Sequence, residues 1–460
     1  MTKDEDSEDD LPGARVDVVE AGHSAREGRL TCEIGEHINV ETELLASYFL
    51  TKWDPVVLDA LLVAAGVEFC DKIKRRPRLG WGRAFELRVP VSNPDRWKSP
   101  AVHDALIDAL QFLTGDVWDI TFVKRRKVLE TPQETLQLSL DGELAILPFS
   151  EGLDSRIVAG LMADKWGARL IRVRLGSKSN DRPATPGGRP QPFTTIPYEV
   201  RAAGHSFAET SARSRGFKFA MLSGIAAYLS KAATIFVPES GQGALGPALV
   251  PVGQAYSDYR NHPLFMRRME VLLAALFGHR ARFEFPRLWF TKGQTLAEYL
   301  RASRNTEWSK TRSCWQDNRH ASVDGKRRQC GICAACMLRR LSVHAAGHTE
   351  KRETYIWDLK APTFEEGAAD GLKKIDGAQR EYAIAGTLHL DHMANLKRAP
   401  VHAPTIRLNA SQLAKALGMT EDLARSNLDS LLDRHASEWK AYMTSLGSKS
   451  FVNRWTGRAA

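Results

Sequence analysis

The run Leu144–Phe149 is apolar at every position, as expected of a strand whose two faces are both buried. A helical pattern around Ile157 follows it, and Arg169–Leu175 has the composition of a second strand. A second helix over about Gly216–Lys231 and a third strand at Thr234–Val237 continue the alternation. Because parallel strands need crossover connections, this β-α-β-α-β order predicts an α/β fold with a parallel sheet.

The regions on either side of this centre have other patterns. Like charges in Asp4–Asp10 repel one another and predict a solvated tail, whereas the next hundred residues mix strand and helix periods. Towards the end of the chain the pattern is helical, with Ser411 and Thr420 as expected helix caps. We therefore expect a disordered acidic tail at 1–27, an α+β accessory domain at 28–140, the central domain at 141–345 and a helical domain at 346–460.

Two segments allow more than one interpretation. Gly176–Pro197 holds five prolines and follows a predicted strand, so it is either a lid over a substrate or a surface insertion. Ser411–His435 has the outline of a helix-turn-helix with Gly418 in the turn. A plain helical hairpin is the preferred interpretation, because that turn pattern alone is weak.

The hexapeptide Ser150–Ser155 joins the first predicted strand to the first predicted helix. Small residues at such a turn let backbone amides approach a phosphate, and the helix N-terminus adds positive potential. Asp154 could cap the helix or hold a magnesium ion that faces a pyrophosphate. An ordinary N-capped helix is the alternative.

Four of the six cysteines lie close together in the sequence, in the order Cys314, Cys330, Cys333 and Cys336. The C-x2-C-x2-C spacing can place three thiolates on one knuckle, and a fourth closes a tetrahedron around Zn²⁺. With four protein ligands the ion would be structural. An iron–sulfur cluster is the rival interpretation, disulfides are a poor third, and Cys32 and Cys70 are interpreted as idle thiols.

Composition excludes several classes of protein. With 43% hydrophobic residues in 460, the chain can bury one or more cores, and no stretch is long and apolar enough to span a membrane. The first residues contain no apolar segment of a secretion signal, so we expect a cytoplasmic protein. The net charge of +9 is diluted over a long chain and does not by itself indicate a nucleic acid.

The hexapeptide resembles the pyrophosphate loop, Ser-Gly-Gly-X-Asp-Ser, of the PP-loop ATP pyrophosphatases. In order and spacing, the hexapeptide and the segments after it resemble the 7-cyano-7-deazaguanine synthase (QueC) family over about residues 144–340. The later segments are Arg213–Phe217, Tyr256–Arg260, Phe290–Lys292, Ser313–Trp315 and Cys330–Arg339.

This resemblance implies a Rossmann-like sheet of the adenine nucleotide alpha hydrolase type and an AMP-forming, ATP-dependent C–N ligase. Such enzymes use ATP and Mg²⁺ to adenylate the carboxylate of 7-carboxy-7-deazaguanine. Ammonia then gives an amide, and a second activation dehydrates the amide to the nitrile. The family also suggests a homodimer.

By position, the resemblance assigns ATP to the loop and the deazapurine to three later residues. The loop residues that would bind ATP are Ser150, Glu151, Gly152, Leu153, Asp154 and Ser155. Lys292 would neutralise phosphate charge and complete the catalytic set with Ser150, Asp154 and Ser155. The candidates for binding the deazapurine are Asp258, Arg260 and Glu239, of which Glu239 could accept hydrogen bonds from a guanine-like edge. A surface ion pair or a loop cap is the alternative interpretation of each. Glu151 replaces a family glycine, and Tyr259 replaces the cysteine of the family's Asp-Cys-Arg segment.

The additional regions at both ends resemble the QatC-type proteins of anti-phage defence operons. An added domain implies an added partner, so the acceptor amine can belong to a protein or an operon-encoded subunit. Two other functions stay open. One is a PP-loop tRNA-modifying enzyme, suggested by the basic runs Lys72–Arg76 and Lys124–Lys127, although such runs are more often solvated surface. The other is a degenerate nucleotide-binding scaffold, suggested by Glu151.

Overall fold

The computed structural model describes residues 11–40, 54–77, 80–127, 142–150, 152–175, 196–210, 213–251, 255–303, 306–316, 322–372 and 375–457. The chain forms two compact units, each assembled from several stretches. The first unit comprises residues 1–149, 166–237 and 254–284, and the second comprises 150–165, 238–253 and 285–460. The domain boundaries expected at residues 141 and 346 stay predictions.

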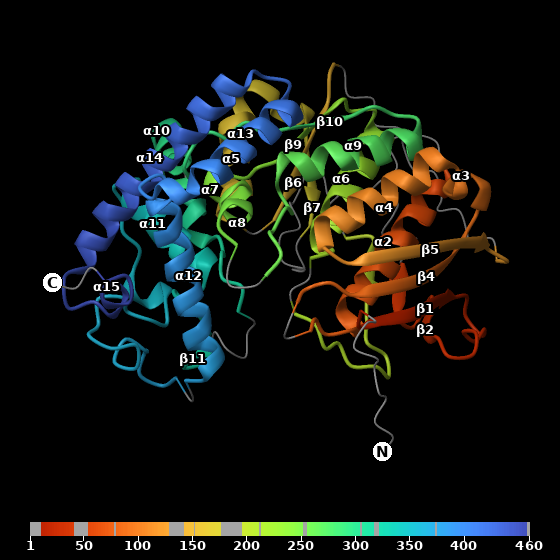
Figure 1. The fold of residues 1–460 in the computed structure, drawn as a ribbon, viewed down its shortest axis with the longest axis horizontal. Helices are drawn as coiled ribbons and strands as arrows, with labels where there is room; N and C mark the ends of the chain where they lie inside the picture. The colour runs from red at the N-terminus through yellow and green to blue at the C-terminus, as the bar shows by residue number, and fades with distance from the viewer. Residues whose placement is uncertain are drawn as a thin grey trace, which may run out of the picture. The chain divides into compact units, whose positions relative to one another are not determined.

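The N-terminal part of the first unit is built on a four-stranded sheet with the order β2-β1-β4-β5 (Figure 1). The strands are β1 (Gly13–Val19), β2 (Leu30–Glu33), β4 (Ala84–Val91) and β5 (Val117–Lys124). All neighbouring strands of this sheet are parallel, so this region has an α/β arrangement and is not the expected α+β domain.

Strand β1 lies inside the stretch 1–27, which was expected to be a disordered tail. That expectation is wrong for residues 13–19, which pair with β2 on one side and β4 on the other. The acidic run ends at Asp10, and beyond it Val16, Val18 and Val19 are buried. Burial of these side chains offsets the entropy of ordering the strand.

Three helices accompany this sheet: α2 (Pro55–Ile73), α3 (Pro94–Lys98) and α4 (Pro100–Thr114). Helix α2 begins at its N-cap Asp54, whose side chain accepts a hydrogen bond from the Val56 amide. A proline opens each of the three helices, where its missing N–H costs nothing. Small strands β3 (Ile38–Val40) and β8 (Tyr198–Val200) form an antiparallel pair in the same unit.

Arg83 is the centre of a buried ion network in this unit. Its guanidinium is fully buried and lies 2.5 Å from Asp71 Oδ1 and 2.9 Å from Asp116 Oδ2. We expect Arg83→Met to lower the free energy of unfolding by about 3–5 kcal/mol, because two buried carboxylates then share Arg76 alone as their cation. Guanidinium titration of the unfolding transition measures this loss.

A matched control lies in the same sheet, where exposed Arg15 pairs with exposed Glu86. Arg15→Met should cost less than about 1 kcal/mol, because water screens this pair. Equal losses in the two variants would contradict the assignment of a buried network.

The central sheet has the order β10-β9-β6-β7, with parallel neighbours throughout. Its strands are β6 (Ala145–Phe149), β7 (Leu170–Arg174), β9 (Thr234–Phe236) and β10 (Arg282–Glu284). The connecting helices are α5 (Leu153–Trp166), which a short 3-10 turn at Gly167–Arg169 extends, α6 (Arg215–Ser230) and α9 (Pro263–Phe277). The predicted α/β fold with a parallel sheet is confirmed, while β10 was not predicted.

The strand order of this sheet reverses between β6 and β9. From β6 the chain crosses to β7 on one side and then returns to β9 on the other. In open α/β sheets, ligands bind at the carboxyl ends of the strands where the order reverses. The segment Ser150–Ser155 follows β6 along the chain, and Glu239 follows β9.

The second unit is mainly helical, which confirms the predicted helical C-terminal region. Short helices α7 (Gly241–Ala244) and α8 (Gly246–Leu249) precede α10 (Lys292–Ala302) and α11 (Ala334–Ala345). The C-terminal helices are α12 (Gly377–Asn395), α13 (Ala403–Leu417), α14 (Glu421–Leu446) and α15 (Phe451–Trp455). Helices α11, α12 and α14 pack against one another (Figure 1). The two-residue strands β11 (Ser322–Val323) and β12 (Lys326–Arg327) pair between α10 and α11 along the chain.

The region Ser411–His435 is a helical hairpin of α13 and α14, as preferred over a helix-turn-helix. Gly418 ends α13 in the left-handed conformation (φ 68°), and Thr420 caps α14 by accepting a hydrogen bond from the Leu423 amide. Ser411 is no cap, because α13 begins earlier, at Ala403.

Two findings bear on the remaining expectations. Residues 176–195 of the expected lid or insertion lie outside the described residues. None of the helices in the described ranges combines the length and apolar character that crossing a bilayer requires.

Candidate functional site

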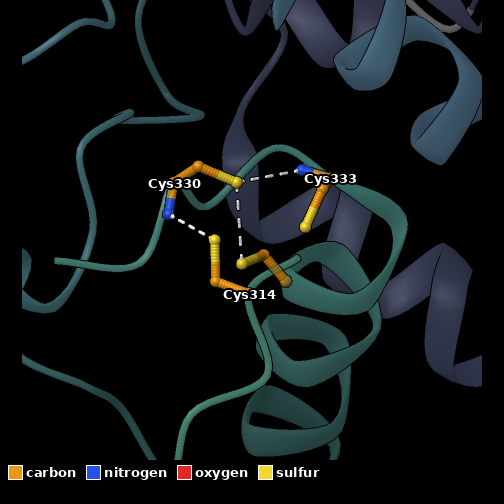
Figure 2. Close-up of side chains that lie close together, drawn as sticks. Cys314, Cys330 and Cys333 are labelled. Carbon is orange, nitrogen blue, oxygen red and sulfur yellow. Dashed lines mark hydrogen bonds between the residues drawn. The ribbon is translucent and has the colours of Figure 1, made fainter. Parts of the chain in front are cut away.

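The four predicted metal-ligating cysteines come together in the second unit. The side chains of Cys314, Cys330 and Cys333 point toward a common centre (Figure 2), and the sulfurs of all four cysteines lie within 4.8 Å of one another. Cys330 and Cys333 come from the turn before α11, Cys336 from its first turn, and Cys314 from the segment after α10. Three of the four are buried, and Cys314 is partly exposed.

The sulfur geometry fits one tetrahedral ion. With Zn–S bonds of about 2.3 Å, the sulfurs of a regular tetrahedron lie about 3.8 Å apart. The sulfurs of Cys330 and Cys336 are 3.8 Å apart. A disulfide would need about 2.05 Å, and all six cysteines are free. In an iron–sulfur cluster the thiolates bind more than one iron and lie further apart. The cluster therefore fits a closed, structural zinc site.

Two glycines make room for this knuckle. Gly331, between the first two cysteines of the C-x2-C-x2-C string, has φ +85°, a conformation that side chains rarely adopt. At Gly386 of α12, an added Cβ would lie 2.7 Å from the Ala334 amide nitrogen. Helix α12 thus contacts the knuckle backbone directly. The knuckle is part of the main hydrophobic core of this unit, together with Trp357 and Trp439.

Arg339, the last residue of the segment Cys330–Arg339, holds two parts of the cysteine cluster together. It is fully buried, and its Nη1 donates to the Thr311 carbonyl at 3.0 Å and the Thr311 hydroxyl at 2.7 Å. Its Nη2 pairs with Glu350 at 2.7 Å. Arg339 therefore ties the segment that leads into Cys314 to the helix that carries Cys336.

The loop predicted to bind pyrophosphate is folded on itself by its two serines. The Ser150 amide donates to Ser155 Oγ at 3.1 Å, the Gly152 amide donates to Ser150 Oγ at 3.1 Å, and Ser155 Oγ donates to the Ser150 carbonyl at 2.9 Å. Helix α5 then begins at Leu153, with Asp154 in its first turn. Glu151 lies outside the described residues. The loop is a compact strand-to-helix turn at a helix N-terminus.

Three predicted site residues from separate stretches meet in the second unit. Lys292 Nζ lies 2.6 Å from Asp154 Oδ2 and 3.8 Å from Glu239 Oε1. Lys292 is the first residue of α10, and its side chain is only 7% exposed. Gly243 leaves room for Glu239, since a Cβ there would lie 2.1 Å from Glu239 Oε1. A buried ammonium thus faces two carboxyl groups.

Burial and neighbouring charges shift the pKa values of two groups in this cluster. Burial and the nearby Asp154 raise the pKa of Glu239 to about 8, against the opposing effect of Lys292. Burial by itself lowers the pKa of Lys292, but Asp154 and Glu239 outweigh it and raise that pKa. At neutral pH Lys292 is therefore charged, and Glu239 holds a proton that a bound divalent cation would displace. Paired carboxylates are a donor set that suits Mg²⁺.

Asp258 and Arg260, the other substrate candidates, lie in the first unit. Asp258 is paired with Arg260 Nη2 at 2.6 Å and with Arg213 Nη1 at 3.2 Å. Burial raises the pKa of Asp258, but the two guanidinium groups outweigh burial and lower it to about 2. The close approach requires Gly216, where a Cβ would lie 2.9 Å from Arg260 Cγ. Asp258 is thus a fixed anion that orients two arginines.

Sequence reasoning missed three residues around Lys292: Gln242, Thr291 and Glu438. Thr291 caps α10, and its hydroxyl and the Gln294 side chain form a capping box. The spacing Thr-x-x-Gln is a sequence pattern that could have identified this cap. Gln242 and Glu438 have no such pattern, because their contacts with the segment around Lys292 join distant parts of the chain.

Comparisons with known proteins gave one match. No curated protein and no solved structure matches the chain. Residues 243–347 match the family model described as queuosine biosynthesis protein QueC. This segment includes Asp258, Arg260, Lys292 and all four clustered cysteines, but not the Ser150–Ser155 loop or Glu239. Residues 243–347 are therefore similar to the QueC family, over less than a quarter of the chain.

Proposed function

We propose that the protein is an AMP-forming, ATP-dependent ligase that activates the carboxylate of 7-carboxy-7-deazaguanine or a related deazapurine and transfers it to an amine. The meeting of Lys292 with Asp154 and Glu239 carries this proposal. It joins a lysine of the QueC family segment to the strand-to-helix loop after β6. That loop has the position of a phosphate-binding turn in an α/β sheet.

The chain's own residues have distinct roles in this reaction. The loop at the N-terminus of α5 would bind the pyrophosphate of ATP by exchanging the internal hydrogen bonds of Ser150, Gly152 and Ser155 for bonds to phosphate oxygens, and Lys292 would neutralise its charge. Asp154 and Glu239 would hold Mg²⁺, which lowers the negative charge that the leaving pyrophosphate develops. The four cysteines would hold Zn²⁺ as a structural ion, because no coordination position remains for water.

Activation makes a poor electrophile reactive. A carboxylate oxygen of the substrate bonds to the α-phosphorus of ATP while the bond to pyrophosphate breaks. An amine nitrogen then bonds to the acyl carbon, AMP leaves and one proton is released. Arg260, whose Nε and Nη2 donate to Asp258, is the candidate for binding the substrate carboxylate through the other edge of its guanidinium.

The acceptor amine is proposed to come from ammonia or from a partner protein in anti-phage defence. The family match covers less than a quarter of the chain, so most of the chain lies outside it. Intact-mass analysis of co-expressed neighbouring proteins would show a nucleobase-sized adduct if a protein is the acceptor. Unmodified masses would leave ammonia as the acceptor.

The tRNA-modifying alternative gains no support from the basic runs. Arg76 is buried and pairs with Asp116 at 2.8 Å, and Lys72 pairs with Glu68 at 2.9 Å. In the second run, Arg125 pairs with Asp59 at 3.0 Å. Lys72, Arg76 and Arg125 thus take part in ion pairs, whereas other basic residues of the runs, among them Arg126 and Lys127, are exposed as the side chains of a solvated surface are.

Product analysis tests the proposed function directly. After incubation with ATP, Mg²⁺, 7-carboxy-7-deazaguanine and ammonium, mass spectrometry should detect AMP together with the amide or the nitrile. Asp154→Asn is expected to lower the rate of AMP formation by about 10²–10³-fold, because it removes the negative charge that would bind Mg²⁺ and that pairs with Lys292. ADP as the only nucleotide product, or no product with the wild-type protein and its partners, would refute the assignment.

A further inference from the structure

Glu438 of helix α14 touches the turn that carries Lys292. Its Oε1 accepts a hydrogen bond from the Thr291 hydroxyl at 2.5 Å, and its Oε2 lies 3.5 Å from Gln242 Nε2. Thr291 is fully buried and caps α10, the helix whose first residue is Lys292. A carboxylate beside a helix N-terminus also interacts favourably with the helix dipole. Glu438 is therefore bonded to the residue directly before the proposed catalytic lysine.

Gln242 provides a second link to the same turn. Its Oε1 accepts from the Lys292 backbone N–H at 2.8 Å, and its Nε2 lies 2.8 Å from His435 Nδ1. The Nε2 of His435 lies 2.9 Å from the Leu390 carbonyl, which can only accept, so this nitrogen carries the proton. Nδ1 is then free to accept from Gln242, which orients the amide so that its oxygen faces Lys292.

Burial shifts the pKa values of both titratable groups in this network. His435 is fully buried, and burial lowers its pKa to about 4, so the ring is neutral as the hydrogen bonds require. Burial raises the pKa of Glu438 to about 7, although the bonds from Thr291 and Gln242 oppose the rise. Gly293 permits the approach, since a Cβ there would lie 2.7 Å from Ala345 Cβ and 3.2 Å from Glu438 Oε1.

From these contacts we infer that Glu438, acting through Thr291 and together with Gln242 and His435, is a positioning residue for Lys292. Helix α14 lies outside the matched QueC segment, which ends at residue 347. The C-terminal helices thus complete the lysine site from outside the family segment. The inference rests on the proposed function only in assigning Lys292 to ATP phosphates; the positioning itself is a property of the contacts.

The test compares variants of the full-length protein by two readouts. The first is the rate at which an amine-acylating ester modifies Lys292, followed by peptide mass spectrometry; it needs no enzymatic activity. The second is the split between kcat and the KM for ATP in AMP formation. The variants are Glu438→Ala, Thr291→Val and Thr291→Ser. The control is Asp433→Asn, which removes a charge from an exposed position on α14 that pairs with Lys397.

The ester should acylate Lys292 several-fold faster in Glu438→Ala and Thr291→Val than in wild type, because the lysine is no longer fixed against Asp154. Their kcat should fall by about 10- to 100-fold, with a raised KM for ATP, as expected for a misplaced group. Thr291→Ser, which keeps the hydroxyl, should retain most of the kcat that Thr291→Val loses. Asp433→Asn should match wild type in both readouts.

Unchanged acylation of Lys292 in both Glu438→Ala and Thr291→Val would overturn the inference, as would equal effects in Asp433→Asn. Glu438→Gln, which keeps the side-chain shape, replaces Glu438→Ala if the alanine variant does not fold. If the wild-type protein forms no AMP but the acylation rates change as expected, the proposed function fails while the positioning role stands.

Discussion

Cys330→Ser is expected to abolish zinc binding and to unfold the core of the second unit. The residue is 1% exposed and belongs to the hydrophobic cluster that also contains Trp357 and Trp439. Binding of structural zinc contributes about 10–16 kcal/mol in small zinc sites, which is comparable to the whole stability of a domain. Losing one thiolate therefore removes the ion and leaves three thiols, two of them buried, that no longer share a cation.

Metal analysis and thermal unfolding measure this result. The wild-type protein should contain about one zinc per chain, and a strong chelator should lower its melting temperature. Cys32→Ala is the control, because Cys32 is buried in the first unit and is not one of the four clustered cysteines. Iron in place of zinc, or full zinc content in Cys330→Ser, would contradict the assignment.

Lys292→Met should lower the rate of AMP formation by about 10²–10³-fold, the usual effect of removing a group that stabilises developing charge. Methionine keeps much of the length of lysine but loses the ammonium. The variant leaves Asp154 and Glu239 facing each other without their shared cation. Loss of the ammonium removes the positive charge that would attract the ATP phosphates, so the KM for ATP should also rise.

Lys310→Met is the matched control, since Lys310 is 72% exposed and pairs only with neighbouring Glu307 among the ion pairs of the described residues. Its rate of AMP formation should equal that of wild type. Rates measured at saturating ATP separate a loss of catalysis from a loss of binding. An AMP-forming rate for Lys292→Met within about threefold of wild type would show that Lys292 has no role in charge stabilisation.

The central fold could be predicted because its strands are apolar and its helices periodic. In the sheet, Ala145, Ile146 and Leu147 are fully buried, which is why the run reads as a strand without alternation. Strand β10 was missed because its three residues, Arg282–Glu284, include two charged side chains. Strand β1 was missed because the acidic run before it suggested that the tail extended further.

The cysteine cluster shows how much spacing alone can predict. The C-x2-C-x2-C string permits only a tight turn, so three sulfurs must lie close together, and a lone fourth cysteine nearby indicates a tetrahedral site. The contacts of Gly386 and Arg339 that hold this turn in place could not be predicted. The contact of Gly386 depends on how closely helices α11 and α12 pack, and those of Arg339 join α11 to the distant segments around Thr311 and Glu350.

The loop and lysine were identified separately, by their resemblance to a family motif. The ion pair between Asp154 and Lys292 at 2.6 Å could not be predicted from local sequence, because the two residues are far apart in the chain. The role expected for Glu239 was to bind a guanine edge. That remains a prediction, and the structure places its carboxyl oxygen 3.8 Å from Lys292 Nζ.

The sequence by itself determined the elements of local order: the apolar strands, the periodic helices, the cysteine turn and the strand-to-helix loop. Each of these depends on residues within a few positions of one another, where backbone sterics and side-chain period decide the outcome. Only the tertiary structure decided which side chains meet. The contacts of Lys292 with Asp154 and Glu239, and of Glu438 with Thr291, arise from the burial of distant segments in one core, and local chemistry does not specify them.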